Sequence, residues 1–151
     1  MKIVVQRSLN SFVKVHDKIV GKIDRGLVLL IGFAKEDQIE DLDNMLHKVL
    51  NLRIFPDDEG KMNQSILDIN GKVLSISQFT LQADTKKGNR PSFQSAMPYD
   101  EAKDLYEIWN QKLSQFVWVE TGKYGEDMQV QITNDGPVTI LLESRGNHVK
   151  R

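Results

Sequence analysis

The sequence predicts an α+β domain in which a mostly antiparallel sheet carries two helices. The first third of the chain contains short β-branched or apolar runs separated by polar or glycine breaks, which is typical of strands. Two later segments carry apolar residues at three- and four-residue spacing, which predicts helices. Further strands flank the second helix without a regular strand–helix alternation. The length of 151 residues fits a single domain, which we assign to residues 1–143.

The first half is expected to hold four strands and one helix. The strands are Lys2–Arg7, Phe12–His16, Ile19–Ile23 and Leu27–Phe33. Residues 38–52 follow as a helix, because one face of this segment is apolar. That face consists of Ile39, Leu42, Met45, Leu46, Val49 and Leu50. The acidic run before Gly60 is predicted to be a turn.

The second half is expected to hold three more strands and the second helix. A strand over Lys72–Leu81 is followed by a polar loop from Gln82 to Ser92. The helix covers residues 99–116, with an apolar stripe formed by Ala102, Leu105, Tyr106, Trp109, Leu113 and Phe116. Strands at Met128–Thr133 and Val138–Leu142 complete the domain. Residues 144–151 are expected to form a mobile basic tail.

Composition excludes several kinds of chemistry. The chain has 40% hydrophobic and 27% charged residues, as ordinary globular proteins do. It has no cysteine, which rules out disulfides, thiolate metal sites and a cysteine nucleophile. The N-terminal residues do not resemble a signal peptide, and the longest apolar run is too short to span a bilayer, so a cytoplasmic location is expected. The net charge of −1 means that any nucleic-acid site is a local feature.

Two short segments carry a family resemblance. They are SQFTL at Ser77–Leu81 and NDGPVT at Asn134–Thr139. Together they resemble the paired signatures of the D-aminoacyl-tRNA deacylases. Four further blocks agree in order and spacing: VVQR from Val4, RIFPDDEGKMN from Arg53, KKGNRPSF from Lys86 and TGKYGEDMQV from Thr121. The resemblance covers residues 1–143.

The resemblance implies a fold, an assembly and a reaction. The fold is a roll of antiparallel strands flanked by two helices, and the assembly is a homodimer with active sites at the subunit interface. The reaction is hydrolysis of the ester in D-aminoacyl-tRNA, and in glycyl-tRNA, to free tRNA and amino acid. Ser77, Gln78, Phe79 and Thr80 match the motif that forms the catalytic floor. Gly136 and Pro137 match a lid that enters the site of the partner subunit.

Thr80 is the obvious nucleophile, but no nearby residue in the sequence can act as its base. The three histidines, His16, His47 and His148, are expected to be structural or exposed. Alternatively, the ribose 2′-hydroxyl of the tRNA assists water, and the protein supplies position and backbone donors. The resemblance points to this second mechanism, in which Thr80 positions the substrate.

No metal or other cofactor is expected. The sequence has no histidine or acidic pair at metal-ligand spacing. Asp57, Asp58 and Glu59 superficially resemble a cation site, but acidic residues before a glycine are typical of a solvated turn.

The lid is expected to select chirality. The resemblance implies a cis Gly136–Pro137 bond whose two carbonyl groups crowd an L side chain and leave room for D-residues and glycine. Arg7 either braces the lid of the partner subunit or lies exposed at a strand end. Phe79 either belongs to the core or presents its backbone N–H to the substrate. Met128 is either core or a wall of the pocket.

Local cations are expected to hold the tRNA. Lys86, Lys87 and Arg90 follow the SQFTL motif and suit the phosphates of the acceptor end, or they form a solvated loop. Cations in residues 145–151 add a diffuse patch. Two rival functions remain, a threonine-dependent esterase of small molecules and a non-catalytic nucleic-acid-binding module. The near-neutral charge argues against the module and against DNA as a partner.

Overall fold

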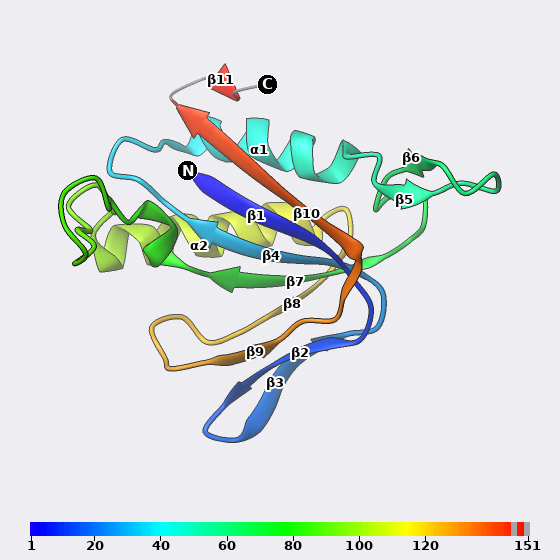
Figure 1. Ribbon diagram of the computed structural model, residues 1–151, viewed down its shortest axis with the longest axis horizontal. Helices are drawn as coiled ribbons and strands as arrows, with labels where there is room; N and C mark the ends of the chain where they lie inside the picture. The colour runs from blue at the N-terminus through cyan, green and yellow to red at the C-terminus, as the bar shows by residue number, and fades with distance from the viewer. Residues whose placement is uncertain (146–147, 150–151) are drawn as a thin grey trace.

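The protein has three layers, with two helices on one face of a large sheet and a small sheet on the other (Figure 1). The computed structural model describes residues 1–145 and 148–149. No helix in this part of the chain is long and apolar enough to cross a membrane. The α+β class is confirmed, as is the pair of flanking helices.

The large sheet mixes antiparallel and parallel pairing. In spatial order its strands are β11 (His148–Val149), β10 (Asn134–Arg145), β1 (Lys2–Ser8), β4 (Gly26–Gly32), β7 (Lys72–Ser77) and β8 (Trp118–Thr121). The pairs from β11 to β4 are antiparallel, whereas β4–β7 and β7–β8 are parallel. Each parallel pair is joined by a crossover that contains a helix, as parallel neighbours require.

Both helices are amphipathic and cover the same face of this sheet. α1 (Ile39–Asn51) begins where the backbone N–H of Gln38 donates to the carboxylate of Asp41, 2.9 Å away. α2 (Tyr99–Ser114) begins directly after Pro98, which fixes the entry angle of the chain. Their buried faces and the sheet share one apolar core, in which Trp109 is fully enclosed.

The small sheet covers only part of the opposite face. Its strands are β3 (Lys18–Ile23), β2 (Ser11–Val15) and β9 (Gln129–Gln131), paired in that order. Val13 and Ile23 pack against Val28, Leu74 and Ile76, which lie on β4 and β7. A separate hairpin of β5 (Phe55–Pro56) and β6 (Met62–Gln64) projects from the body of the protein (Figure 1).

Several boundaries differ from the sequence prediction. β7 ends at Ser77 and not at Leu81, because a 3₁₀ turn, η1 (Phe79–Gln82), follows it. Phe116 lies beyond α2 and is exposed. β10 continues past Leu142 to Arg145, and the side chain of Ser144 is buried. The strands β5, β6 and β8, and the parallel pairing, were not predicted. Short segments of mixed polarity carry too little periodicity to be recognised.

Candidate active site

The SQFTL segment turns sharply at the end of β7. The backbone N–H of Gln78 still pairs with the carbonyl of Ile31 at 2.7 Å, and η1 begins with the next residue. Gly32 allows this turn to pack on β4, because a Cβ there would lie 2.7 Å from the carbonyl oxygen of Gln78. The Gln82 side chain then donates to the Gly32 carbonyl at 2.8 Å, which fixes the far end of the turn.

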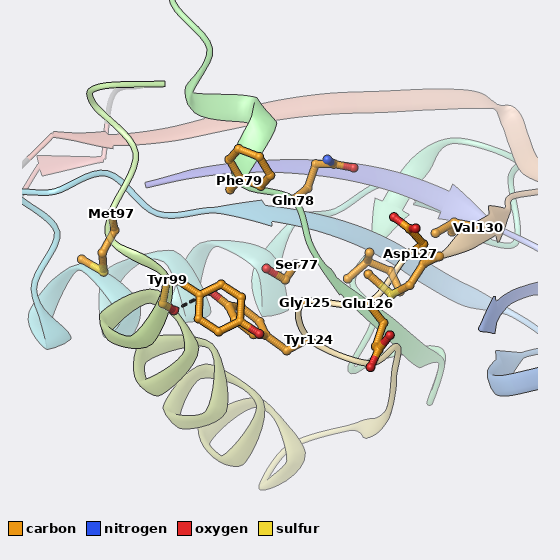
Figure 2. A pocket seen from close by; sticks show the side chains of 12 residues that line it. Ser77, Gln78, Phe79, Met97, Tyr99, Tyr124, Gly125, Glu126, Asp127 and Val130 are labelled. Carbon is orange, nitrogen blue, oxygen red and sulfur yellow. Dashed lines mark hydrogen bonds between the residues drawn. The ribbon is translucent and has the colours of Figure 1, made fainter. Parts of the chain in front are cut away.

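A cavity of about 520 Å³ opens beside this turn. Ser77, Gln78 and Phe79 form one wall (Figure 2), and Met128 also lines the cavity. The volume falls within the roughly 300–1,000 Å³ of small-molecule sites. The structure thus brings together four of the residues predicted for the site. Phe79 is not a core residue, since its side chain is 56% exposed and meets the Phe93 ring edge-on at 5.1 Å.

Tyrosines from α2 support the opposite wall. The Tyr124 hydroxyl donates to the backbone carbonyl of Tyr99 at 2.8 Å, and their rings meet at a centroid distance of 5.0 Å (Figure 2). Tyr106 stacks behind Tyr124 and donates to the carbonyl of Ser75, 2.7 Å away on β7. The loop that carries Met128 is therefore fixed both to α2 and, through Tyr106, to the strand that ends at Ser77.

The charged groups at the cavity are acidic. Glu126 and Asp127 line the side away from the tyrosines (Figure 2), and His16 approaches Glu126 at 4.0 Å. Burial raises the pKa of the Tyr124 phenol, as do the nearby Tyr99 and Asp100. Tyr124 consequently remains a neutral hydrogen-bond donor at physiological pH. No group of His, Asp or Glu residues in the described part of the chain is arranged to hold a metal.

Thr80 lies on the turn but does not line the cavity. Its hydroxyl accepts a hydrogen bond from the Gln78 amide at 2.5 Å. No histidine or carboxylate bonds to it within residues 1–145. The backbone N–H groups of Phe79 and Thr80 find no acceptor in that same range, as expected for the first residues of a helical turn. The turn therefore presents free donors and no base.

The NDGPVT segment forms a bulge in β10 at the other end of the sheet. Gly136 has a φ of +116°, and the Gly136–Pro137 bond is cis, the isomer that the resemblance implied. Arg7 holds the bulge from β1. Its guanidinium donates to the Asp135 carbonyl at 3.2 Å and to the Ile54 carbonyl at 2.8 Å, and it pairs with the Asp135 carboxylate at 3.1 Å.

This arrangement contradicts the interpretation of Arg7 as an exposed strand-end residue, whereas a contact of Arg7 with the lid of the partner subunit stays a prediction. Its side chain is only 12% exposed, so it is not a free strand-end cation. The loop that it braces belongs to its own chain, because β1 and β10 are direct neighbours around Gln6 and Thr139.

Within one chain the two motifs lie far apart. Arg7 on β1 pairs with Leu27 on β4, which in turn pairs with Val73 on β7. Val73 lies four residues before Ser77 along that strand. Three strand spacings also separate β10 from β7. At roughly 3.3 Å per residue and 4.8 Å per strand, the separation is on the order of 20 Å. Figure 1 shows the end of β7 and the start of β10 at opposite ends of the sheet.

The predicted tRNA-binding cations lie on an exposed loop beyond the turn. Lys86, Lys87 and Arg90 are all exposed, and a bridge between Asp84 and Ser92 closes the loop. Phe93 connects the base of the loop to Phe79 at the cavity. The side chains of Arg145, His148, Lys150 and Arg151, which were expected to add a diffuse patch, lie outside the described residues.

Comparison with known proteins assigns the family. Residues 4–143 match the family described as D-Tyr-tRNA(Tyr) deacylase. The chain belongs to this family. It is therefore a hydrolase of the aminoacyl-tRNA ester that edits D-amino acids from tRNA. This match confirms the family resemblance that the SQFTL and NDGPVT segments indicated.

Two solved structures resemble this deacylase chain. One, described as "c-Myc DNA Unwinding Element Binding Protein", has a TM-score of 0.92 and 42% identity. The match covers 97% of this chain and 100% of that one. The other is described as a "probable eukaryotic D-amino acid tRNA deacylase", with a TM-score of 0.80 and 19% identity. This second match covers 93% of this chain and 97% of that one. At 19% identity it shows that the two proteins share a fold.

Several wall residues of the deacylase cavity were not anticipated. They are Met97, Tyr99, Tyr124, Glu126 and Asp127. Tyr99 and Tyr124 lie on different elements, and only the tertiary fold brings them together. Tyr124 stands between Gly122 and Gly125, and these glycines mark the segment as a loop without indicating that its tyrosine lines a site.

Proposed function

We propose that the chain hydrolyses D-aminoacyl-tRNA, and glycyl-tRNA, with the 3′-terminal aminoacyl-adenosine in the cavity beside Ser77 and with no catalytic side-chain base. The observation that carries this proposal is the turn after β7, which offers free backbone N–H groups and leaves Thr80 without a base. Apolar and aromatic walls, including Met128 and Tyr124, suit a nucleoside with few polar contacts.

In the proposed reaction, water adds to the ester carbonyl carbon and generates an oxyanion. The N–H groups of Phe79 and Thr80 stabilise that charge, which is worth several kcal/mol in other acyl-transfer enzymes. The neighbouring 2′-hydroxyl accepts a proton from the water and passes one to the departing 3′ oxygen. Cleavage of the bond to this oxygen yields the free amino acid and tRNA. Gln78 and Thr80 keep the turn in place through their mutual hydrogen bond.

Chiral selection requires a second subunit in this proposal. Gly136 and Pro137 are exposed on their own chain, and a distance on the order of 20 Å separates them from Ser77. Arg7 holds the bulge in position, so it can enter the cavity of a partner as a preformed lid. The carbonyl groups of the lid would crowd an L side chain, and the hydrogen of a D-residue or glycine would fit there.

A partly covered apolar row supports the homodimer. Leu141, Val4 and Leu30 lie opposite one another on the sheet face that points away from the helices. The small sheet packs over β4 and β7 and against Leu30 at one end of the row, whereas Leu141 at the other end remains 57% exposed. An apolar row that ends in an exposed leucine is typical of a surface that a partner covers. A cytoplasmic location follows from the proposed substrate, because aminoacyl-tRNA is made and used there.

One experiment tests the reaction and the role of the RNA together. The purified protein is incubated with D- and L-tyrosyl-tRNA, and with D-tyrosyl-tRNA whose terminal ribose lacks the 2′-hydroxyl, and amino-acid release is followed. Hydrolysis of the D-ester alone, lost without the hydroxyl, is expected. Equal hydrolysis of D and L esters would disprove the lid. Hydrolysis that does not depend on the hydroxyl would favour a threonine-dependent esterase.

A further inference from the structure

The outer face of the small sheet concentrates cations and amides. Strand partners that lie directly opposite share a face. Phe12 stands between Lys22 on β3 and Gln131 on β9, and Lys14 faces Gln129 in the neighbouring row. The intervening residues, such as Val13, point inward and belong to the second core. The side chains of these two rows therefore form one outward surface, which we call the β2 platform.

The positive charge of the β2 platform is not compensated. Lys14 and Lys22 form no salt bridge with any carboxylate in residues 1–145, whereas Lys72 pairs with Asp24 at 3.5 Å. No acidic residue occupies the paired rows of the β2 platform. Lys14 instead lies over the Phe12 ring, with its ammonium 5.5 Å from the ring centroid. The ring holds this ammonium on the sheet without cancelling its charge.

The nearest acidic groups are at the margins. Asp17 lies in the hairpin turn that joins β2 to β3, and Glu126 lies near His16. At the other end, Asp24 is engaged with Lys72.

A groove runs along one end of the β2 platform. It has a volume of about 370 Å³ and is lined by Asn10, Phe12, Lys22 and Lys72, with Asp24 beside Lys72. The unpaired ammonium of Lys22 and the Asn10 amide thus meet at one hollow beside an aromatic ring, where Lys72 is already paired with Asp24. This combination suits a nucleic-acid strand, whose phosphates bind ammonium groups and whose unpaired bases stack on aromatic rings.

The β2 platform is continuous with the active-site cavity through β9. Val130 lines the cavity, while its chain neighbours Gln129 and Gln131 face the β2 platform. β9 is the edge of its sheet, so a strand that leaves the cavity reaches Lys14 after about one strand spacing, roughly 5 Å.

We propose that the β2 platform binds the phosphate backbone of the tRNA acceptor arm while the 3′ end occupies the cavity. This inference rests on the proposed deacylase function and adds a second contact surface to it. Backbone contacts of this kind give position without reading sequence. They suit an enzyme that accepts many tRNAs.

The test compares a full substrate with a minimal one. Lys14→Glu/Lys22→Glu is expected to raise KM for D-tyrosyl-tRNA about tenfold. It should also reduce the steepness of log(kcat/KM) against log salt by about 1.4 to 1.8, since each of the two lost phosphate contacts removes roughly 0.7–0.9. Hydrolysis of D-tyrosyl-adenosine, which has no phosphates, should not show this increase. Lys103→Glu on α2 makes the same kind of charge change on the helical side of the protein and serves as the control. Lys14→Gln/Lys22→Gln provides a milder variant if the first folds poorly.

Each outcome decides a separate point. If the double variants keep the KM and the salt slope of the unaltered protein, the proposal that the β2 platform binds tRNA is wrong. The proposed deacylase function would still stand. An equal rise in KM with Lys103→Glu would overturn the β2 platform proposal too, because the effect would then be general repulsion. If a single-stranded DNA oligonucleotide competes with the substrate as strongly as tRNA without an amino acid does, the β2 platform is a DNA-binding surface and the proposal is wrong. If the unaltered protein hydrolyses neither substrate, the proposed function itself is wrong.

Discussion

At the scale of single residues, Thr80 separates the two possible mechanisms. Its hydroxyl is exposed and bonded to the Gln78 amide, and the described residues around it provide no base. We expect Thr80→Ala to lower kcat/KM for D-tyrosyl-tRNA by less than about tenfold, because only a positioning contact is lost. Removing a true nucleophile costs on the order of 10⁴-fold or more. Single-turnover hydrolysis with saturating enzyme measures the chemical step directly.

Thr85→Ala is the matched control for this substitution, since Thr85 is exposed in the loop beyond the turn. It should leave the rate unchanged. A loss of 10⁴-fold in Thr80→Ala, restored by Thr80→Ser, would establish Thr80 as the nucleophile and remove the RNA-assisted mechanism.

Gly136 is the residue on which the proposed lid depends. With a φ of +116°, it adopts a conformation that side chains disfavour, and a Cβ there would lie 2.9 Å from both the Arg7 guanidinium and the Val138 side chain. Gly136→Ala should therefore displace the bulge and raise KM for D-tyrosyl-tRNA at least about tenfold. Steady-state kinetics with D-tyrosyl- and glycyl-tRNA measure this effect.

Gly60→Ala makes the same change at a φ of +78°, where no neighbouring atom lies within 4 Å. It should cost roughly 1–2 kcal/mol of stability from backbone strain alone and leave KM unchanged. If Gly136→Ala turned over D-substrate normally, the lid would have no part in binding.

At the scale of elements, the clearest lesson is the end of β7. Val73, Leu74 and Ile76 mark the buried strand correctly, and Phe79 continues the apolar pattern. The pattern does not reveal that the chain leaves the sheet after Ser77, because that depends on the close approach of Gly32 from β4. The motif locates the site in the sequence, whereas packing between distant elements decides its shape.

The two tyrosine hydrogen bonds behind the cavity wall are expected to have different roles. The bond of Tyr124 shapes the cavity, and the bond of Tyr106 stabilises the fold. Tyr124→Phe removes the hydrogen bond to the Tyr99 carbonyl at the cavity, so a net loss of about 0.5–1.5 kcal/mol and a several-fold rise in KM are expected. Tyr106→Phe leaves the buried carbonyl of Ser75 without its donor, which should cost about 1–3 kcal/mol. Urea unfolding and kinetics on both variants distinguish the roles. A larger KM effect for Tyr106→Phe than for Tyr124→Phe would contradict this division.

At the scale of the whole molecule, the sequence predicted the class of fold but not the arrangement of the site. The two helices and most of the first four strands follow from periodicity. The parallel pairing of β4, β7 and β8 joins segments many residues apart, and local patterns do not encode which strands become neighbours. The distance between SQFTL and NDGPVT within one chain follows from that pairing, so it became visible only in the structure.

Mixing two damaged subunits tests whether those motifs meet across an interface. Ser77→Trp fills the cavity of its own chain, and Gly136→Val damages the lid, so each homodimer should be inactive. Random reassociation gives hetero-dimers in half of the molecules. Each hetero-dimer has one site with an intact cavity and an intact lid. About a quarter of the wild-type activity should therefore return, measured as D-tyrosyl-tRNA hydrolysis after mixing and refolding.

The same mixture also defines the outcome that would contradict a shared site. If cavity and lid acted within one chain, every chain in the mixture would carry a defect and no activity would return. Mixing Ser77→Trp with Gly60→Ala is the positive control, because Gly60→Ala homodimers keep both intact motifs. Recovery in this control but not in the Gly136→Val mixture would place the lid and the cavity on the same chain, despite the roughly 20 Å that separates them across the sheet.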